Sequence, residues 1–210
     1  MTGILWDLDG TLLDTLGDLT DAVNYALRTH GHPERTMEEV RTFIGSGARL
    51  LIQRAIPAGG DVESVMELFQ SYYRSHCRIK TKPYEGIHEA LEALGQKYPM
   101  AIVSNKPDVA VKLLCDEIFP GIYARGESAD CPRKPAPDMV FMAMQTIGVE
   151  RCIYVGDSDV DVQTAKNAGM PCLSVLWGFR NREDIAQAGG THFCETVSQL
   201  QEKLEELING

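Results

Sequence analysis

Short apolar runs alternate with longer amphipathic segments along most of the chain, and this alternation predicts an α/β protein. The first run, from Gly3 to Trp6 with Leu8 continuing it, is apolar throughout, as in a strand that is buried on both faces. Similar runs predict further strands at residues 100–104, 122–124, 152–155, 171–176 and 192–194. Helical periodicity between these runs implies parallel strands joined by right-handed crossovers, so the predicted core is a doubly wound parallel sheet.

Between about residues 15 and 80 the sequence shows helical periodicity and no strand pattern. The apolar spacing predicts a helix that begins near Leu16 and ends at Gly31-His32-Pro33, and Thr36 is expected to cap the next helix. Two more helical patterns follow before Pro83, where the chain returns to the α/β pattern. The predicted organisation is therefore a core formed by residues 1–14 and 83–210, with an all-helical cap inserted at residues 15–82.

Two aspartates, Asp7 and Asp9, follow the first predicted strand and precede Gly10. Side chains two residues apart on an extended backbone point roughly the same way. Ligands bind at the carboxyl ends of strands in open α/β sheets, so this pair is a candidate for catalysis. Taken alone, the same residues also suit a polar turn after a strand.

Three other polar motifs favour the catalytic interpretation. Ser104 ends a predicted strand, Lys134 lies in a proline-rich loop, and Asp157 and Asp161 follow a third strand. In order, D-x-D-G-T, Ser-Asn, Lys-Pro and G-D-x-x-x-D resemble the four motifs of the haloacid-dehalogenase-like superfamily of phosphohydrolases, and they span nearly the whole chain. The all-helical insertion after the first motif resembles the members that carry a helical cap.

The resemblance implies a role for each motif residue. Asp7 would be the nucleophile that forms an aspartyl-phosphate, and Asp9 would protonate the leaving alcohol and then deprotonate the attacking water. Ser104, with neighbouring amides such as that of Asn105, would hold a phosphoryl oxygen. Lys134 would neutralise the nucleophile and the phosphate. Haloacid dehalogenases do not need the second aspartate, so Asp9 favours a phosphate substrate over a halide.

Clustered carboxylates call for a cation, because two like charges 4 Å apart repel by about 4 kcal/mol at an effective dielectric constant of 20. Oxygen ligands favour Mg²⁺, which keeps several waters and binds substrate phosphates. By the resemblance, the ligands are Asp7, the backbone carbonyl of Asp9, and Asp157. Asp161 would act through water or orient Lys134.

The cap offers weaker candidates for substrate binding. The segment around Gly47 lacks the spacing of a phosphate-binding nucleotide loop, and it resembles the flexible cap segment that covers the active site in this superfamily. Arg49 could pair with a substrate carboxylate or phosphate, or could be an exposed helix arginine. Residues 15–79 contain no lysine, which argues against the phosphonate-cleaving relatives. Lys106 and Arg133 are expected to be surface charges.

These features predict a Mg²⁺-dependent phosphatase, and the helical cap with Ser104-Asn105-Lys106-Pro107 most resembles the phosphoglycolate phosphatase branch. The first expected substrate is therefore 2-phosphoglycolate. A sugar phosphomutase, a pyrophosphatase or a nucleotidase of the same superfamily are alternatives. A phospho-accepting signalling module is the alternative outside enzymes, although it would need neither Asp9 nor a cap.

Composition limits the partners and the compartment. The chain has 210 residues, a formal charge of −10 and a pI near 5.0, which argues against nucleic acid as a partner. The resemblance implies a small phosphorylated metabolite instead. We expect a cytoplasmic protein, because no signal peptide or membrane span is recognisable. The six cysteines form no C-x-x-C pair and are expected to be unpaired thiols. A monomer and a homodimer remain open.

Overall fold

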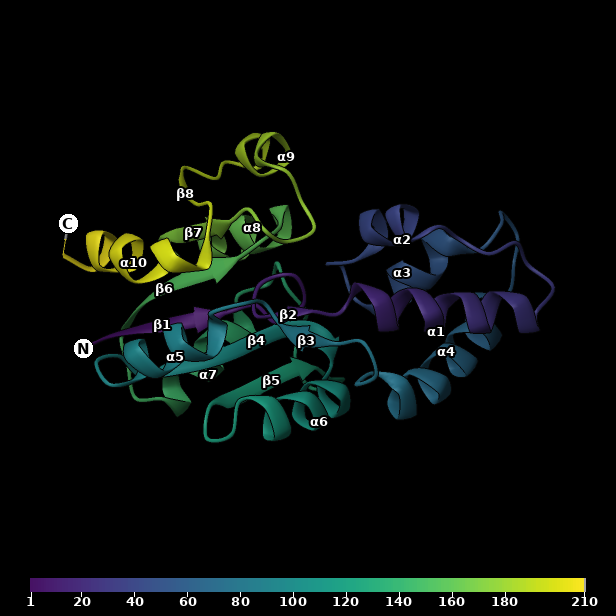
Figure 1. Ribbon diagram of the computed structural model, residues 1–210, viewed down its shortest axis with the longest axis horizontal. Helices are drawn as coiled ribbons and strands as arrows, with labels where there is room; N and C mark the ends of the chain where they lie inside the picture. The colour runs from purple at the N-terminus through teal and green to yellow at the C-terminus, as the bar shows by residue number, and fades with distance from the viewer. Residues whose placement is uncertain (210) are drawn as a thin grey trace.

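The computed structural model describes residues 1–209 and is built on a parallel sheet with the strand order β5-β4-β1-β6-β7-β8 (Figure 1). Its strands are β1 (Thr2–Trp6), β4 (Met100–Pro107), β5 (Tyr123–Glu127), β6 (Arg151–Gly156), β7 (Cys172–Val175) and β8 (His192–Cys194). All five pairings between neighbouring strands are parallel, which confirms the predicted fold class. β1 lies between β4 and β6, so the residues that follow it emerge near the middle of the sheet edge.

Helices cover both faces of this sheet, as the alternation of side chains along β1 shows. Ile4 and Trp6 pack into one apolar cluster and Leu5 into a second one, and all three are fully buried. The first cluster receives side chains from α5 (Ile87–Gly95), α6 (Asp108–Ile118) and α10 (Leu200–Asn209). The second receives them from α7 (Asp138–Thr146) and α8 (Asp159–Asn167). The prediction that β1 is buried on both faces is confirmed.

Four helices lie beyond one end of the sheet, at the right of Figure 1, and we call them the cap helices. They are α1 (Leu16–Thr29), α2 (Met37–Phe43), α3 (Ala48–Ala55) and α4 (Val62–His76). The start of α2 follows from its sequence, because Thr36 Oγ1 accepts the N–H of Glu39 at 3.2 Å and the Glu39 carboxylate accepts the N–H of Thr36 at 2.8 Å. The predicted cap at Thr36 is confirmed.

A short antiparallel ribbon joins the cap helices to the sheet, and the sequence did not reveal it. It pairs β2 (Leu13–Asp14) with β3 (Lys82–Pro83), where the chain leaves the core and returns to it. Beside it, the buried Asp18 carboxylate accepts the backbone N–H groups of Ile79, Lys80 and Thr81 at 2.8 to 3.1 Å. The outgoing and returning segments are thus fixed to each other.

Other details differ only locally from the sequence prediction. β4 continues past Ser104 to Pro107, with an irregular register against β5 between Val103 and Pro107. A six-residue helix, α9 (Arg182–Gln187), and a 3₁₀ turn at Val197–Gln199 were not expected.

All six cysteines are free, as predicted. Among residues 1–209, no helix combines the length and apolar character needed to cross a membrane.

Candidate active site

Three carboxylates meet at the carboxyl ends of β1 and β6. Asp7 follows β1, Asp157 follows β6, and Asp161 lies in the first turn of α8. One carboxylate oxygen from each lies within 4.8 Å of the others, and all three side chains are buried. The central strands therefore bring together residues that are up to 154 positions apart in the chain.

Burial and mutual repulsion make this cluster unfavourable when it is fully ionised. Burial, followed by the nearby Asp161 carboxylate, raises the pKa of Asp7 to about 7, although Lys134 opposes the change. Burial, followed by Asp161 and Asp7, also raises the pKa of Asp157 well above its usual range. One ammonium group faces three carboxylates, so the site has the charge and the oxygen ligands that suit a divalent cation.

That ammonium group belongs to Lys134, whose side chain is 1% exposed. Its Nζ lies 2.9 Å from Asp7 Oδ1 and donates at 2.8 Å both to Asp161 Oδ1 and to the Tyr154 hydroxyl. All three of its donors are therefore in use. Burial alone lowers the pKa of Lys134, but Asp161 and Asp7 outweigh it and raise the pKa above its ordinary value. Lys134 remains charged.

The hydrogen bonds of Asp7 are unevenly distributed over its two oxygens. Oδ1 accepts the backbone N–H of Leu8 at 2.7 Å and lies 2.9 Å from Lys134 Nζ. Among the described residues, no hydrogen bond reaches Oδ2. Oδ1 is thus held in place, while Oδ2 is available to react.

Asp157 is held by residues on both sides of it. Its Oδ2 accepts the N–H of Phe179 at 2.7 Å, and its Oδ1 accepts the Thr11 hydroxyl at 3.2 Å. Gly10 is required beside it, because its φ of 86° disfavours other residues and a β-carbon there would collide with the Asp157 carboxylate. The glycine of the D-x-D-G motif therefore lets β1 and β6 deliver their carboxylates to one point.

Asp9 has a partner that the sequence analysis assigned wrongly. Lys106 was expected to be a surface charge, but its side chain is only 3% exposed and its Nζ donates to Asp9 Oδ1 at 2.8 Å. The ammonium also lies 4.7 Å from the centre of the Tyr73 ring. The error arose because β4 runs on to Pro107, which carries Lys106 inward under the cap. Arg133, by contrast, is partly exposed and lies 3.8 Å from Glu127.

Asn105 connects three parts of the site through its side chain. Its Nδ2 donates to the carbonyls of Lys134 and Gly45 at 2.9 and 3.1 Å, and its Oδ1 accepts the Lys134 N–H at 2.8 Å. The amide thereby fixes the lysine loop to the cap segment. Ser104 lies beside it, buried, and its Oγ accepts the N–H of Lys106 at 3.2 Å.

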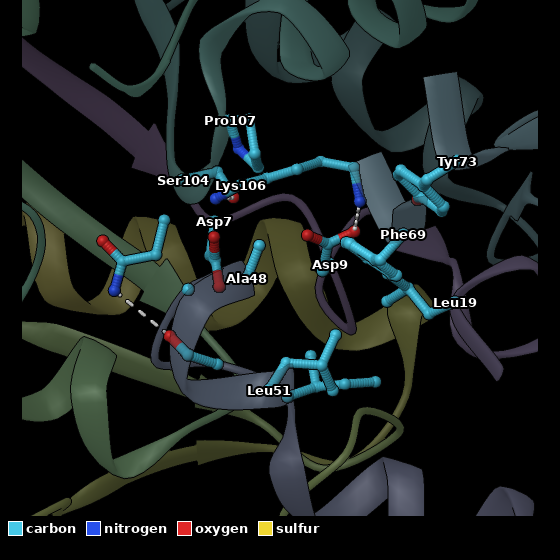
Figure 2. Close-up of a pocket in the computed structure, with 14 residues that line it drawn as sticks. Asp7, Asp9, Leu19, Ala48, Leu51, Phe69, Tyr73, Ser104, Lys106 and Pro107 are labelled. Carbon is cyan, nitrogen blue, oxygen red and sulfur yellow. Dashed lines mark hydrogen bonds and ion pairs between the residues drawn. The ribbon is translucent and has the colours of Figure 1, made fainter. Parts of the chain in front are cut away.

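A pocket lies between these residues and the cap helices (Figure 2). Its empty space of about 500 Å³ includes open solvent. Its walls combine site residues with apolar side chains from α1, α3 and α4. The lining residues are Asp7, Asp9, Leu19, Ile44, Gly45, Gly47, Ala48, Leu51, Phe69, Tyr73, Ser104, Asn105, Lys106 and Pro107.

A family model for haloacid dehalogenase-like hydrolases matches residues 4–175, which contain every motif described above. The chain belongs to this family. The phosphoglycolate phosphatase 1 of Pseudomonas aeruginosa is 35% identical over 94% of this chain and 77% of its own length. The phosphoglycolate phosphatase of Vibrio parahaemolyticus is 31% identical over 95% of this chain and 94% of its own. A crystal structure of a candidate phosphoglycolate phosphatase from Lactobacillus delbrueckii subsp. bulgaricus superimposes with a TM-score of 0.91, at 38% identity, over 96% of this chain and 97% of that one.

Within this haloacid dehalogenase-like hydrolase, the structure separates the two candidate residues of the cap. Gly47 lines the pocket, and glycine is favoured there because its φ is 88° and a β-carbon would lie only 2.9 Å from Glu127 Oε2. Arg49 is not among the lining residues. It is about half exposed and lies 2.5 Å from Glu63 on the surface of the cap. The structure therefore brings Gly47, but not Arg49, to the site.

The sequence analysis did not single out the aromatic residues of this hydrolase's pocket. Phe69 and Tyr73 are one helical turn apart on α4, and this spacing reads as an ordinary apolar helix face. Only the Tyr73 hydroxyl distinguishes that face from a simple core contact. For Lys106, the sequence did offer one indication of a place in the site, because it directly follows Ser104 and Asn105.

Proposed function

We propose that the protein is a phosphatase that hydrolyses a small phosphomonoester through a phosphorylated Asp7. One observation carries the proposal: Asp7 lines the pocket while its Oδ1 is bound to Lys134, within a cluster that also holds Asp157 and Asp161. Membership of a hydrolase family and relatives named phosphoglycolate phosphatase support it.

The residues suit an in-line displacement in two steps. Asp7 Oδ2 attacks phosphorus, forming an acyl phosphate as the bond to the ester oxygen breaks, and Asp9 gives the leaving oxygen its proton. Asp9 then takes a proton from water, which attacks the same phosphorus. Inorganic phosphate leaves and the Asp7 carboxylate is restored. Ser104 Oγ and the Asn105 backbone amide are proposed to hold a phosphoryl oxygen.

The three carboxylates fit Mg²⁺, and we assign Asp7, Asp157 and the backbone carbonyl of Asp9 as the groups that would hold it. When bound, the ion would neutralise charge on the phosphoryl group. Asp161 has another use, because its Oδ1 accepts from Lys134 and its Oδ2 accepts from Ser158 Oγ at 2.6 Å. Through its bond to the ammonium group, Asp161 is proposed to orient Lys134.

We also propose that residues 15–82 act as the cap that selects the substrate, since α1, α3 and α4 supply the apolar wall of the pocket. The first substrate to test is 2-phosphoglycolate, after the names of the relatives.

The test is phosphate release from a panel of phosphomonoesters led by 2-phosphoglycolate, with Mg²⁺ present and with EDTA. Asp7→Asn should reduce turnover by about a thousandfold or more, because the attacking oxygen is lost. EDTA should reduce it comparably. The matched control is Asp116→Asn, which changes an exposed aspartate on α6 that does not line the pocket, and it should retain wild-type turnover.

Turnover that survives Asp7→Asn would refute the proposal. Return of the phosphate to a sugar substrate, without release to water, would instead identify a phosphomutase. A phosphorylated Asp7 that persists for hours would identify a signalling role.

A further inference from the structure

The pocket has two chemically distinct ends. Figure 2 shows Asp7 and Ser104 at one end, and shows Lys106 extending past them to Asp9 and Tyr73. The first end contains the proposed nucleophile. The second contains an ammonium group, and of the described residues that line the pocket Lys106 alone has a cationic side chain.

Lys106 is buried with unused hydrogen-bonding capacity. An ammonium group has three N–H donors. Among residues 1–209 the Nζ of Lys106 donates to Asp9 Oδ1 at 2.8 Å and has the Tyr73 hydroxyl as its other neighbouring acceptor, whereas Lys134 uses all three of its donors. A buried donor without an acceptor is unfavourable, so the remaining donor capacity of Lys106 is suited to an acceptor that a ligand supplies.

Tyr73 provides a second, independent observation at the same end. Its side chain lines the pocket and is 4% exposed. In the described part of the chain its hydroxyl oxygen lies near the Lys106 ammonium, which can only donate, so the O–H of Tyr73 has no acceptor. Burial raises the pKa of Tyr73 against the opposing effect of Lys106, so the group stays an O–H donor. Buried donors in folded proteins are nearly always paired, so a pocket-lining O–H without an acceptor, beside an ammonium group with spare donor capacity, suits a ligand that brings acceptor oxygens.

We propose that Lys106 and Tyr73 bind a carboxylate that the substrate carries in addition to its phosphate. The substrate class is thus a short phosphorylated hydroxy acid, of which 2-phosphoglycolate is the smallest. This inference rests on the proposed phosphatase function, because it assigns carboxylate binding to the second end of the pocket whose first end holds the phosphate.

The chemistry of the walls favours a carboxylate over the alternatives. One ammonium and one hydroxyl donor match the two acceptor oxygens of a carboxylate. Leu19, Leu51 and Phe69 supply no hydrogen-bonding side chain for the several hydroxyls of a sugar or for a base. Buried sugar hydroxyls without partners would weaken binding.

The test measures binding and needs no turnover. Calorimetry with Mg²⁺ present compares phosphonoacetate, which carries the carboxylate, with acetonylphosphonate, in which a methyl ketone replaces it. The wild type should bind phosphonoacetate about tenfold or more tightly, because hydrogen bonds to charged groups contribute on that scale. Lys106→Met should abolish this preference, and Tyr73→Phe should reduce it about fivefold, as expected for one hydrogen bond.

The control is Lys112→Met, which removes an exposed lysine on α6 and should leave the preference intact. Equal weakening of both ligands by Lys106→Met would place Lys106 at the phosphate and overturn the proposal. If Lys106→Met does not fold, Tyr73→Phe decides the matter, because removal of a hydroxyl whose O–H has no acceptor leaves the fold unchanged.

The same measurements separate this inference from the proposed function. A wild type that binds both phosphonates equally, and that hydrolyses phosphomonoesters without a carboxylate, would retain the phosphatase assignment and lose the carboxylate site. A wild type that binds neither phosphonate and releases no phosphate would contradict the phosphatase assignment itself.

Discussion

Two lysines of the site have similar burial but different surroundings. Lys134 donates to Asp7, Asp161 and Tyr154, and Asn105 holds its loop through two backbone hydrogen bonds. It is a fixed positive charge beside Asp7. Lys106 has one carboxylate partner and an aromatic neighbour, and so it retains donors for a ligand. The number of satisfied donors, more than burial or charge, distinguishes their roles.

At the same scale, Asp7 makes stability depend on pH when no metal is bound. Burial, and then Asp161, raises the pKa of Asp7 to about 7, whereas an aspartate in an unfolded chain has a pKa of about 3.9. Between those values the folded protein holds a proton that the unfolded chain has lost. The free energy of unfolding therefore falls as the pH rises through this range.

In EDTA, the free energy of unfolding of the wild type in urea should therefore fall from about pH 5 to about pH 7 by about 1 to 3 kcal/mol more than that of Asp7→Asn. The asparagine side chain of this variant does not titrate, so the comparison cancels the contributions of groups that do not interact with Asp7. Mg²⁺ should reduce the difference, because a cation stabilises the ionised carboxylate. Parallel pH curves for the two proteins would show that Asp7 ionises normally in the fold.

At the scale of elements, the connection between the core and the cap helices depends on Asp18. Its carboxylate, 3% exposed, accepts the N–H groups of Ile79, Lys80 and Thr81, so α1 holds the returning strand end at the ribbon of β2 and β3. Asp18→Asn would place an NH₂ group against these donors. We expect a loss of about 2 kcal/mol in the free energy of unfolding, which lowers the melting temperature by about 4 to 8 °C in a chain of this size.

Asp21→Asn is the matched control for Asp18. It lies one turn further along α1, is about half exposed, and forms a surface ion pair with Lys80 at 2.6 Å. Surface pairs contribute little, so its melting temperature should change by about 1 °C or less. Similar losses in both variants would mean that charge on α1, and not the three buried hydrogen bonds, stabilises the connection.

The elements also show what the sequence could and could not predict. Strands such as β1 and β6 were predicted because their apolar runs are buried on both faces, and each ends in a polar motif. The ribbon of β2 and β3 has two residues per strand, too few for any periodicity. Lys106 was misassigned because its burial depends on α4, which is distant in sequence and contributes Tyr73. Local sequence patterns were enough to locate the motifs. The contacts between these motifs and the cap helices could be identified only from the folded structure.

At the scale of the whole molecule, two arginines lock the cap helices to the core. Arg41 of α2 donates to the carbonyls of Gly178 and Phe179 at 2.9 and 3.1 Å. Arg180 donates in the opposite direction, to the carbonyls of Arg41, Thr42 and Ile44 at 2.6 to 3.2 Å. Phe179, between these contacts, donates its N–H to Asp157. The contact that closes the cap is therefore continuous with the carboxylate cluster.

Arg180→Met should loosen this closed arrangement without unfolding the core. The variant leaves three backbone carbonyls without a charged donor at the boundary of the pocket, so amides of residues 37–47 should exchange with deuterium about tenfold faster or more. The Michaelis constant should rise more than kcat falls, because a loosened cap weakens substrate retention before it alters Asp7. Hydrogen exchange with mass spectrometry and steady-state kinetics measure the two effects. The control is Arg182→Met, which removes an exposed arginine that pairs with Glu195 and does not contact the cap helices through that pair. Equal effects in both variants would exclude the loss of cap contacts as the cause.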